Sequence, residues 1–381
     1  MSGNFLMAKK IFISSHALLR APHDCYVVLT SRCNLRCRHC YGDFGIKTPP
    51  HKELTGKEWG KIFRELVALK VFFVNISGGE PSTHKDFCSI IDELKTIQLH
   101  FILTTNGVCS DTVINSILSA RDLLIGVKIS LDGPDFESNS QIRQGVGAYN
   151  PAKCFADTLK TITCFSKEKI PFTISTCLHK GNVSKMWDFV ELIKQLRPIS
   201  WYISTIAPSG RALANPDILV GGAELGNDFW KKIINVCAAH NIYVNLIDMP
   251  ADYSHNGIFE CPAATSFCAI FPDGAVLPCP LAIEGIPTQL IRFDNIKQWS
   301  LKTIWDGIKF KKFRYWKKHG CSGCKMRDSC GHCVVQSVKW FNNPYAPPPI
   351  CIKNSKKLQF QNAKYWEHEF QARLHKKETL K

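Results

Sequence analysis

Cys33, Cys37 and Cys40 lie in the segment CNLRCRHC, directly after an apolar run that predicts a buried strand. Three thiolates this close together can hold one side of a metal centre. A [4Fe–4S] cluster bound by three cysteines keeps one iron without a protein ligand, and that open position can bind a substrate or cofactor. A zinc site with His39 or another histidine as fourth ligand fits the same spacing. The cysteine spacing alone leaves both metals open.

Three more polar motifs follow the next apolar runs. Glycines let the backbone approach a ligand closely, and Glu80 can accept a hydrogen bond from an ammonium group. Each motif alone is more typical of an ordinary turn, but together with the cysteines they follow four successive predicted strands. The motifs are Gly78-Gly79-Glu80-Pro81, Thr105-Asn106-Gly107 and Ser130-Leu131-Asp132-Gly133, with Arg143 after the last.

The elements that position these residues alternate between strands and helices. Thr55 and Glu58 have the spacing of a capping box at a helix start, with Leu54 and Trp59 placed as a hydrophobic staple. Apolar runs predict strands at 25–30, 71–77, 101–105, 125–131, 172–178 and 201–207. Further helices are predicted at 85–99, 112–119, 152–166, 183–196 and 222–239.

Six βα repeats predict an α/β fold with parallel strands, closed as a partial (β/α)6 TIM-like barrel, because no dinucleotide glycine fingerprint follows the first strand. Such barrels place active sites at the C-terminal ends of their strands, where the motifs lie. Near residue 250 the chain becomes loop-rich and Cys-rich. The predicted domains are an N-terminal extension (1–24), the barrel (25–249), an iron–sulfur domain (250–351) and a basic C-terminal helix (352–381).

CxxxCxxC with His39 in an aromatic slot resembles the signature of the radical S-adenosylmethionine (SAM) superfamily. The resemblance implies that Cys33, Cys37 and Cys40 hold a [4Fe–4S] cluster whose open iron binds SAM. Reductive cleavage of SAM then gives a 5′-deoxyadenosyl radical that takes hydrogen from the substrate. In the family, the GGE motif meets the SAM amino group, the serine meets the ribose, and the arginine meets the ribose or carboxylate. The cofactor-binding residues expected here are His39, Gly78, Gly79, Glu80, Asn106, Ser130, Asp132, Arg143 and Ile206.

Two features qualify that expectation. Gln144 follows Arg143 where the family usually has glycine, so Arg143 matches less well than Ser130. Ile206 begins a segment that resembles the PxGRA motif of this group; contact with adenine is one reading, and burial in the strand is the other. No spacing singles out a catalytic base or radical quencher among Asp132, Asp135, Tyr202 and Glu260.

The second cysteine set resembles the SPASM domain, the auxiliary-cluster extension of peptide-modifying radical SAM enzymes. Two CxxC pairs alone would suggest a zinc ribbon. Only Gly331 and His332 separate the last two clustered cysteines, where the family commonly has three residues. By resemblance, two [4Fe–4S] clusters join the SAM-binding one: an inner cluster held by Cys261, Cys268, Cys279 and Cys333, and an outer one held by Cys321, Cys324, Cys330 and Cys351. If Cys268 is not a ligand, the inner cluster keeps an iron without a protein ligand.

This resemblance implies a maturase that acts on a peptide or protein, with a low-potential electron donor such as flavodoxin or ferredoxin. Only 32 residues precede Cys33, so we expect a separate leader-peptide recognition protein or direct substrate binding. A second hypothesis is haem or tetrapyrrole side-chain processing, because the segment from Cys330 to Cys351 is close to that subgroup's layout.

Composition narrows the classes further. The 381 residues include 18 cysteines and show neither a secretory signal nor a membrane-spanning apolar run, which predicts a cytoplasmic protein with reduced thiols. The formal charge of +16 suggests a zinc-dependent nucleic-acid-binding protein as a remote alternative, but that class gives the GGEP and SLDG motifs no role. Three clusters contribute about −5 and lower the charge to about +11. The seven cysteines outside the clusters are expected to pack in the core: Cys25, Cys88, Cys109, Cys154, Cys164, Cys177 and Cys237.

Overall fold

The computed structural model describes residues 19–45, 53–146, 150–207, 209–220, 227–247, 261–324 and 332–348. Within them a nine-stranded sheet has the order β7-β6-β5-β4-β3-β2-β1-β8-β9. Neighbouring strands are parallel throughout except for the β8–β9 pair. The strands are β1 (Asp24–Val28), β2 (Phe73–Ser77), β3 (His100–Thr105), β4 (Leu124–Ser130), β5 (Phe172–Leu178), β6 (Ser200–Thr205), β7 (Tyr243–Ile247), β8 (Phe267–Ile270) and β9 (Val276–Leu277).

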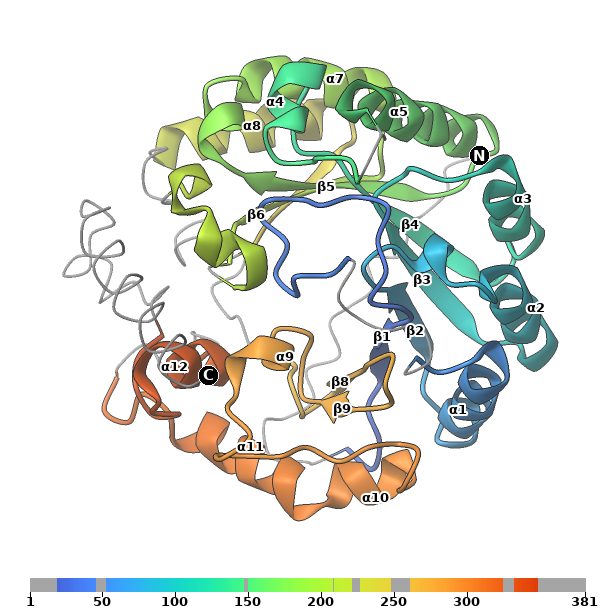
Figure 1. Cartoon of the computed structure of the whole chain (residues 1–381). Helices are drawn as coiled ribbons and strands as arrows, with labels where there is room; N and C mark the ends of the chain where they lie inside the picture. The colour runs from blue at the N-terminus through green and yellow to red at the C-terminus, as the bar shows by residue number, and fades with distance from the viewer. Residues whose placement is uncertain are drawn as a thin grey trace.

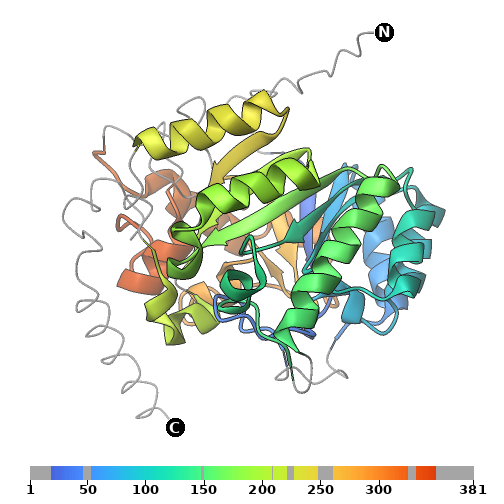
Figure 2. The same ribbon diagram turned by 90° about the horizontal axis from the view of Figure 1, so that it is seen from above.

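The sheet curves into an open arc with helices on its outer side (Figure 1). Seen from above, the crossover helices run alongside the strands that they connect (Figure 2). The α-helices are α1 (Gly56–Ala68), α2 (Phe87–Ile97), α3 (Asp111–Ser119), α4 (Phe136–Ser140), α5 (Pro151–Lys167), α6 (Lys180–Val183), α7 (Met186–Leu196), α8 (Asn227–Ala239), α9 (Ala282–Gly285), α10 (Leu301–Asp306), α11 (Ile308–His319) and α12 (Val334–Phe341). The short 3-10 helices are η2 (Pro81–Thr83), η3 (Gly210–Ala214) and η4 (Pro216–Ile218).

The predicted α/β partial barrel is confirmed, and each of the six predicted strands is present. Two differences concern the ends of the sheet. Strand β7 was not predicted, because its short run has a polar residue, Asn245, at its centre and an exposed Tyr243 at its start. The Cys-rich segment also supplies β8, which pairs with β1, so this segment extends the barrel sheet.

The domain boundaries remain predictions. The proposed junction near 249 and 250 and the C-terminal helix at 352–381 lie outside the described residues, as do residues 1–18 of the extension. The helix predicted at 183–196 corresponds to α7, which begins at Met186, and the short α6 precedes it. Helix α8 fits the predicted 222–239 from Asn227 onward, and residues 222–226 are outside the described ranges. In the described part of the chain, no helix has both the length and the apolar character needed to cross a membrane.

Helix α1 shows how local sequence sets one element. The Thr55 side chain accepts a hydrogen bond from the Glu58 backbone N–H, and the Glu58 carboxylate accepts one from the Thr55 N–H, so the predicted capping box is confirmed. Leu54 and Trp59 are both buried in the main core, as the predicted staple requires.

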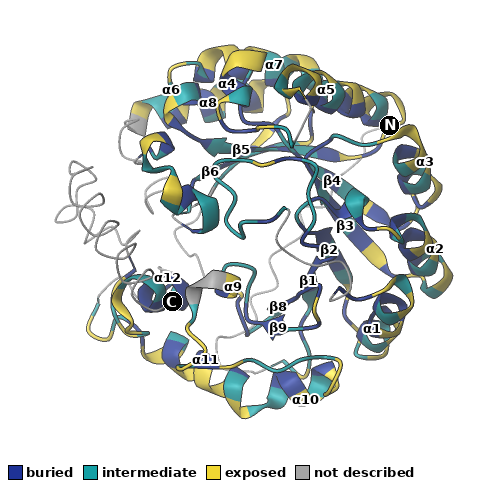
Figure 3. Ribbon diagram, in the orientation of Figure 1, coloured by how far each residue is buried: buried dark blue, intermediate teal, exposed yellow. Residues whose placement is uncertain are grey.

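The two faces of the sheet differ in polarity. Side chains alternate between faces along each strand, and one set is buried under the helices (Figure 3). The other set lines the inner face of the arc and is polar. There, Tyr26 donates to Ser77 at 2.7 Å and Thr104 donates to Asn75 at 2.9 Å. The inner face therefore offers polar groups to a ligand, while the outer face forms the core.

Candidate active site

The loop after β1 carries Cys33, Cys37 and Cys40, all half-buried. It is held in place by a second segment, because Arg36 N–H donates to the Gln144 carbonyl at 2.7 Å and Arg38 N–H donates to the Ile142 carbonyl at 2.9 Å. Burial, with the neighbouring Cys37 and Glu80, raises the pKa of Cys33. Thiols that raise one another's pKa become stable thiolates when a cationic centre joins them, so this set fits an iron–sulfur cluster.

The glycines of the GGE motif bring β2 against the cysteine loop. Gly79 N–H donates to the Thr30 carbonyl and Glu80 N–H donates to the Arg32 carbonyl, both at 2.8 Å. A Cβ on Gly78 would lie 2.7 Å from the Thr30 oxygen, and one on Gly79 would lie 2.2 Å from the Arg32 oxygen. Because these clashes involve backbone, only glycine fits at both positions, and the motif fixes the start of the loop.

Glu80 is fully buried beside that loop. Its carboxylate accepts hydrogen bonds from the Thr105 hydroxyl at 2.9 Å, the Asn106 N–H at 2.7 Å and the Ser82 hydroxyl at 2.8 Å. Burial raises the pKa of Glu80, although these donors oppose the rise. A buried carboxylate in this state gains from a cation, so Glu80 fits the ammonium group of SAM.

Asn106 connects the end of β3 to the cysteine loop. Its side-chain amide donates to the Asn34 side-chain oxygen at 2.7 Å, and its carbonyl accepts from the Thr158 hydroxyl at 3.0 Å. Gly107 follows with a φ of +81°, which favours glycine. The structure therefore places Asn106 between Glu80 and the loop.

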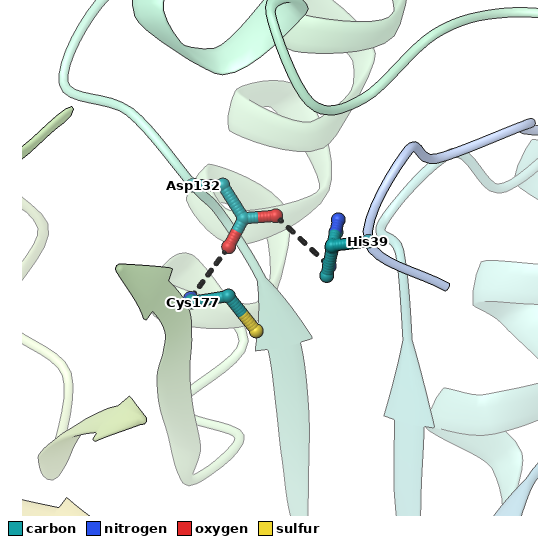
Figure 4. A group of neighbouring side chains, drawn as sticks. All are labelled: His39, Asp132 and Cys177. Carbon is teal, nitrogen blue, oxygen red and sulfur yellow. Dashed lines mark hydrogen bonds and ion pairs between the residues drawn. The ribbon is translucent and has the colours of Figure 1, made fainter. Parts of the chain in front are cut away.

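Asp132 lies in a buried charged cluster after β4 (Figure 4). One oxygen lies 2.7 Å from Arg143 Nε and 3.6 Å from His39 Nε2, and the other accepts from the Cys177 N–H at 2.7 Å. Burial acts to raise the pKa of Asp132, but the Arg143 guanidinium holds it below its usual value. Burial lowers the pKa of His39 to about 4, so its ring is neutral near pH 7.

The cluster around Asp132 contains side chains that could bind a metal ion. His39 directs Nε2 to Asp132, and its Nδ1 has no hydrogen-bond partner among the described residues; because metal-binding histidines commonly have a carboxylate at the other nitrogen, this contact does not decide between zinc and an iron–sulfur cluster. Ligand atoms of His39, Asp132 and Cys177 lie within 4.8 Å of one another, which could suit a metal ion. However, the Arg143 guanidinium already neutralises the Asp132 carboxylate, and its positive charge disfavours a cation there. We therefore assign Asp132 to positioning Arg143 and His39.

The two remaining predicted SAM contacts lie nearby. Ser130 ends β4 on the inner face, in register with Ser175 of β5. Ile206 is buried with Ile142, Ala212 and Ile218 in a small apolar cluster. Contacts of Ser130 with ribose and of Ile206 with adenine stay predictions, as do the SAM contacts expected of the other seven residues.

Arg211 has a role that the sequence did not reveal. Its Nε donates to the Cys37 carbonyl at 2.9 Å, and Nη1 donates to the Asp43 carboxylate and the Phe44 carbonyl, both at 2.7 Å. Gly210, with a φ of +54°, approaches so closely that a Cβ would lie 2.3 Å from the Cys40 oxygen. The PxGRA resemblance was the available signal, and its arginine clamps the cysteine loop.

Lys128 was also missed, because it lies inside an apolar strand pattern. It is on the inner face of β4, with Nζ 3.4 Å from the centre of the Tyr202 ring. Burial lowers the pKa of Lys128 to about 8. A cation that has lost much of its hydration is suited to an anionic group of a ligand.

The auxiliary cysteines of the described residues lie between Cys261 and Cys333. Burial and the neighbouring Cys261 raise the pKa of Cys279 to about 12, and burial, with contributions from Cys40 and Cys279, raises the pKa of Tyr41. Cys333 begins α12, which packs against α9 just after Cys279. Cys321 and Cys324 are half-buried, while Cys330, Cys351 and Glu260 lie outside the described residues. Cys268 is instead fully buried in β8, with Sγ 3.6 Å from Cys25 Sγ.

Family models agree with this double arrangement of cysteines. A model of the radical SAM superfamily matches residues 27–193, and a model of the SPASM iron–sulfur cluster-binding domain matches residues 261–333. The chain is a radical SAM enzyme with a SPASM domain. Its cofactors are SAM, a SAM-binding [4Fe–4S] cluster and auxiliary clusters.

Similar proteins of known activity cover most of this radical SAM chain. PqqA peptide cyclase of Rhizobium meliloti (strain 1021) is 26% identical, over 86% of this chain and 86% of the relative. Mycofactocin maturase MftC of Mycolicibacterium smegmatis is 28% identical, over 85% and 81%. AdoMet-dependent heme synthase of Methanosarcina barkeri is 25% identical, over 88% and 98%.

A solved structure shares the fold. Streptococcus suis SuiB, in a crystal structure with its precursor peptide SuiA, superposes with a TM-score of 0.70 at 15% identity. The match covers 88% of this radical SAM chain and 77% of SuiB.

Proposed function

We propose that this radical SAM enzyme is a maturase that modifies a peptide or protein substrate. The observation that carries the proposal is the pairing of β8 of the Cys-rich segment with β1, the strand that leads into the loop of Cys33, Cys37 and Cys40, which puts the two cysteine sets beside neighbouring strands. A substrate held there would lie between the SAM site and an auxiliary cluster. The peptide-directed activities of PqqA peptide cyclase and mycofactocin maturase support a peptide as that substrate.

The residues of the site have separable roles in this proposal. When bound, the reduced cluster and SAM supply a 5′-deoxyadenosyl radical that abstracts hydrogen from the substrate. Glu80 binds and orients the SAM amino group, and Asn106 holds the end of β3 against the loop. Arg143, oriented by Asp132, places its positive charge near Cys37 of the loop. Lys128 binds an acidic group of the substrate on the inner face.

The proposed partners follow from the same chemistry. A low-potential donor such as flavodoxin or ferredoxin delivers the electron, and the peptide is bound either through a separate leader-recognition protein or directly by the enzyme. The formal charge of +16, about +11 with clusters bound, favours an acidic substrate. We place the protein in the cytoplasm, where thiols stay reduced.

Anaerobic turnover tests the chemistry. Reconstituted protein is incubated with SAM and dithionite, and 5′-deoxyadenosine is measured by mass spectrometry. Cys33→Ala should abolish production, while Cys164→Ala should retain it, because Cys164 lies on α5 away from the loop. Production that survives Cys33→Ala would contradict the proposed site. Short peptides encoded beside the gene are then added, and a SAM-dependent change in peptide mass is expected.

Tetrapyrrole processing is a second candidate, favoured by the similarity to AdoMet-dependent heme synthase over 98% of that protein. Carboxylate-rich porphyrins would also suit Lys128 and the positive charge. Titration with an iron porphyrin, followed by its visible absorbance, separates the two functions. A saturable spectral shift together with unchanged peptide masses would favour the tetrapyrrole function.

A further inference from the structure

The direction of the Cys268 side chain is set by its strand. Phe267 and Cys268 are consecutive in β8, so their side chains lie on opposite faces of the sheet. Phe267 meets the Tyr26 ring edge-on, with centroids 6.4 Å apart, and Tyr26 donates to Ser77 on the inner face. Phe267 therefore faces the inside, and Cys268 faces the outside.

The outer side of Cys268 is already filled. Cys268 is in register with Cys25 of β1, and both are fully buried with their sulfur atoms 3.6 Å apart. Arg314 of α11 interacts electrostatically with Cys268, and its guanidinium lies 4.5 Å from the Trp305 ring centre. Arg314 also donates to the Ala264 carbonyl at 2.6 Å. Cys268 is thus part of the packing between the sheet and α10–α11.

The other inner-cluster cysteines lie on the opposite side. Leu277 of β9 pairs with Ala269, which shares the face of Phe267, so the chain leaves β9 toward Cys279 from the inner face, and the Cys261 thiol lies near Cys279. Cys333 begins the helix that packs against α9, which starts three residues after Cys279. Moving Cys268 to join them would require β8 to turn over, which breaks its pairing with β1.

We propose that Cys268 is not a cluster ligand, and that Cys261, Cys279 and Cys333 bind the inner auxiliary cluster with one iron left open. The open iron faces the inner side of the sheet and takes an anionic donor, for which a substrate thiolate is chemically best suited; the thiol releases its proton to solvent on binding. This inference rests on the SPASM assignment, and its substrate ligand rests on the proposed peptide function.

Iron content tests the ligand set. In a Cys33→Ala, Cys37→Ala, Cys40→Ala background only the auxiliary clusters remain, at about eight irons per chain. Adding Cys268→Ala should leave this content unchanged, as should Cys25→Ala, the matched packing control. Adding Cys279→Ala should remove about half of the iron. Loss of iron on Cys268→Ala but not on Cys25→Ala would overturn the proposal.

A spectroscopic probe tests the open iron without changing Cys268. ¹³C-cyanide is added to the dithionite-reduced triple background, and ¹³C coupling to the cluster is sought by electron–nuclear double resonance. Coupling is expected, and Cys279→Ala should abolish it. Its absence in the background protein would overturn the proposal. If Cys25→Ala and Cys268→Ala both lose iron, disturbed packing explains that loss, and the cyanide coupling then decides whether the inner cluster has an open iron. Neither measurement depends on the substrate, so a failure of the peptide assay can be told apart from a failure of the proposed ligand set.

Discussion

Glu80 is a buried carboxylate without a basic partner among the described ion pairs, and three neighbouring donors prepare it for a cation. Glu80→Gln keeps the shape but removes the charge. A charged hydrogen bond contributes about 1.5–3 kcal/mol, so the Kd for SAM should rise roughly 10- to 100-fold. Anaerobic equilibrium dialysis with reconstituted protein measures it. Glu93→Gln, on a surface pair with Arg64, is the control and should bind SAM normally. Equal affinity of both variants would exclude Glu80 from the SAM site.

Lys128 gives a prediction about pH. Its pKa is lowered to about 8, so it is charged below that pH and loses its proton as the pH rises through it. The KM for an acidic peptide substrate should therefore increase above about pH 8. Lys128→Met should raise KM roughly 10-fold at pH 7, while 5′-deoxyadenosine formation without peptide is unchanged.

The control for this effect is Lys128→Arg, which stays charged at high pH. Its KM should be flat between pH 7 and 9. A pH profile identical to that of the unaltered enzyme would show that another group titrates.

At the scale of elements, η3 and the cysteine loop form one unit. Arg211→Lys keeps a positive charge but loses the planar donors that reach Cys37, Asp43 and Phe44. We expect the loop to loosen and the SAM-binding cluster to be lost several-fold faster in air, measured by absorbance. Arg121→Lys, on an exposed pair with Glu168, should leave that rate unchanged. Similar decay in both variants would contradict the clamp.

The start of helix α1 is stabilised by its local cap and not by residues of the candidate active site. Thr55→Ala removes the side-chain half of the capping box and should cost about 1 kcal/mol. Thermal unfolding of the reconstituted protein should shift by about 2 °C, and Thr55→Ser should restore most of it. An unchanged midpoint in Thr55→Ala would mean that packing of Leu54 and Trp59 holds the helix start without the cap.

At the scale of the whole molecule, we predict that the Cys-rich segment after residue 250 depends on metal for its stability. Its described strands, β8 and β9, are short, and cluster bonds supply folding free energy to such loop-rich domains. Removing iron should make residues beyond 250 the first sites of limited proteolysis, while the helix-covered part of the sheet resists. Mass spectrometry of the fragments locates the cuts. Equal resistance with and without iron would contradict this prediction.

Much of this molecule was predictable from the chain alone. Strand and helix patterns, the capping box and the metal-ligand spacing are local features, so the six strands and the cysteine loop after β1 could be located without coordinates. The motifs at the ends of β2 to β4 could be assigned to one face because parallel strands share their direction. Edge strand β7 was not predicted because its apolar pattern is weak and the strand is stabilised by pairing with its neighbour.

The tertiary structure decided what depends on pairing and direction. Cys25 and Cys268 are 243 residues apart, and only the β1–β8 register shows that they meet on the outer face. Two other contacts also join segments that are distant in the sequence: Lys128 contacts the Tyr202 ring, and Arg211 donates a hydrogen bond to the cysteine loop. The sequence by itself determined which residue types and cofactors this protein uses, because ligand chemistry is carried by residue type and short spacing. Which cysteines, cations and carboxylates share one space was decided by the fold, because strand register sets the face on which each side chain lies.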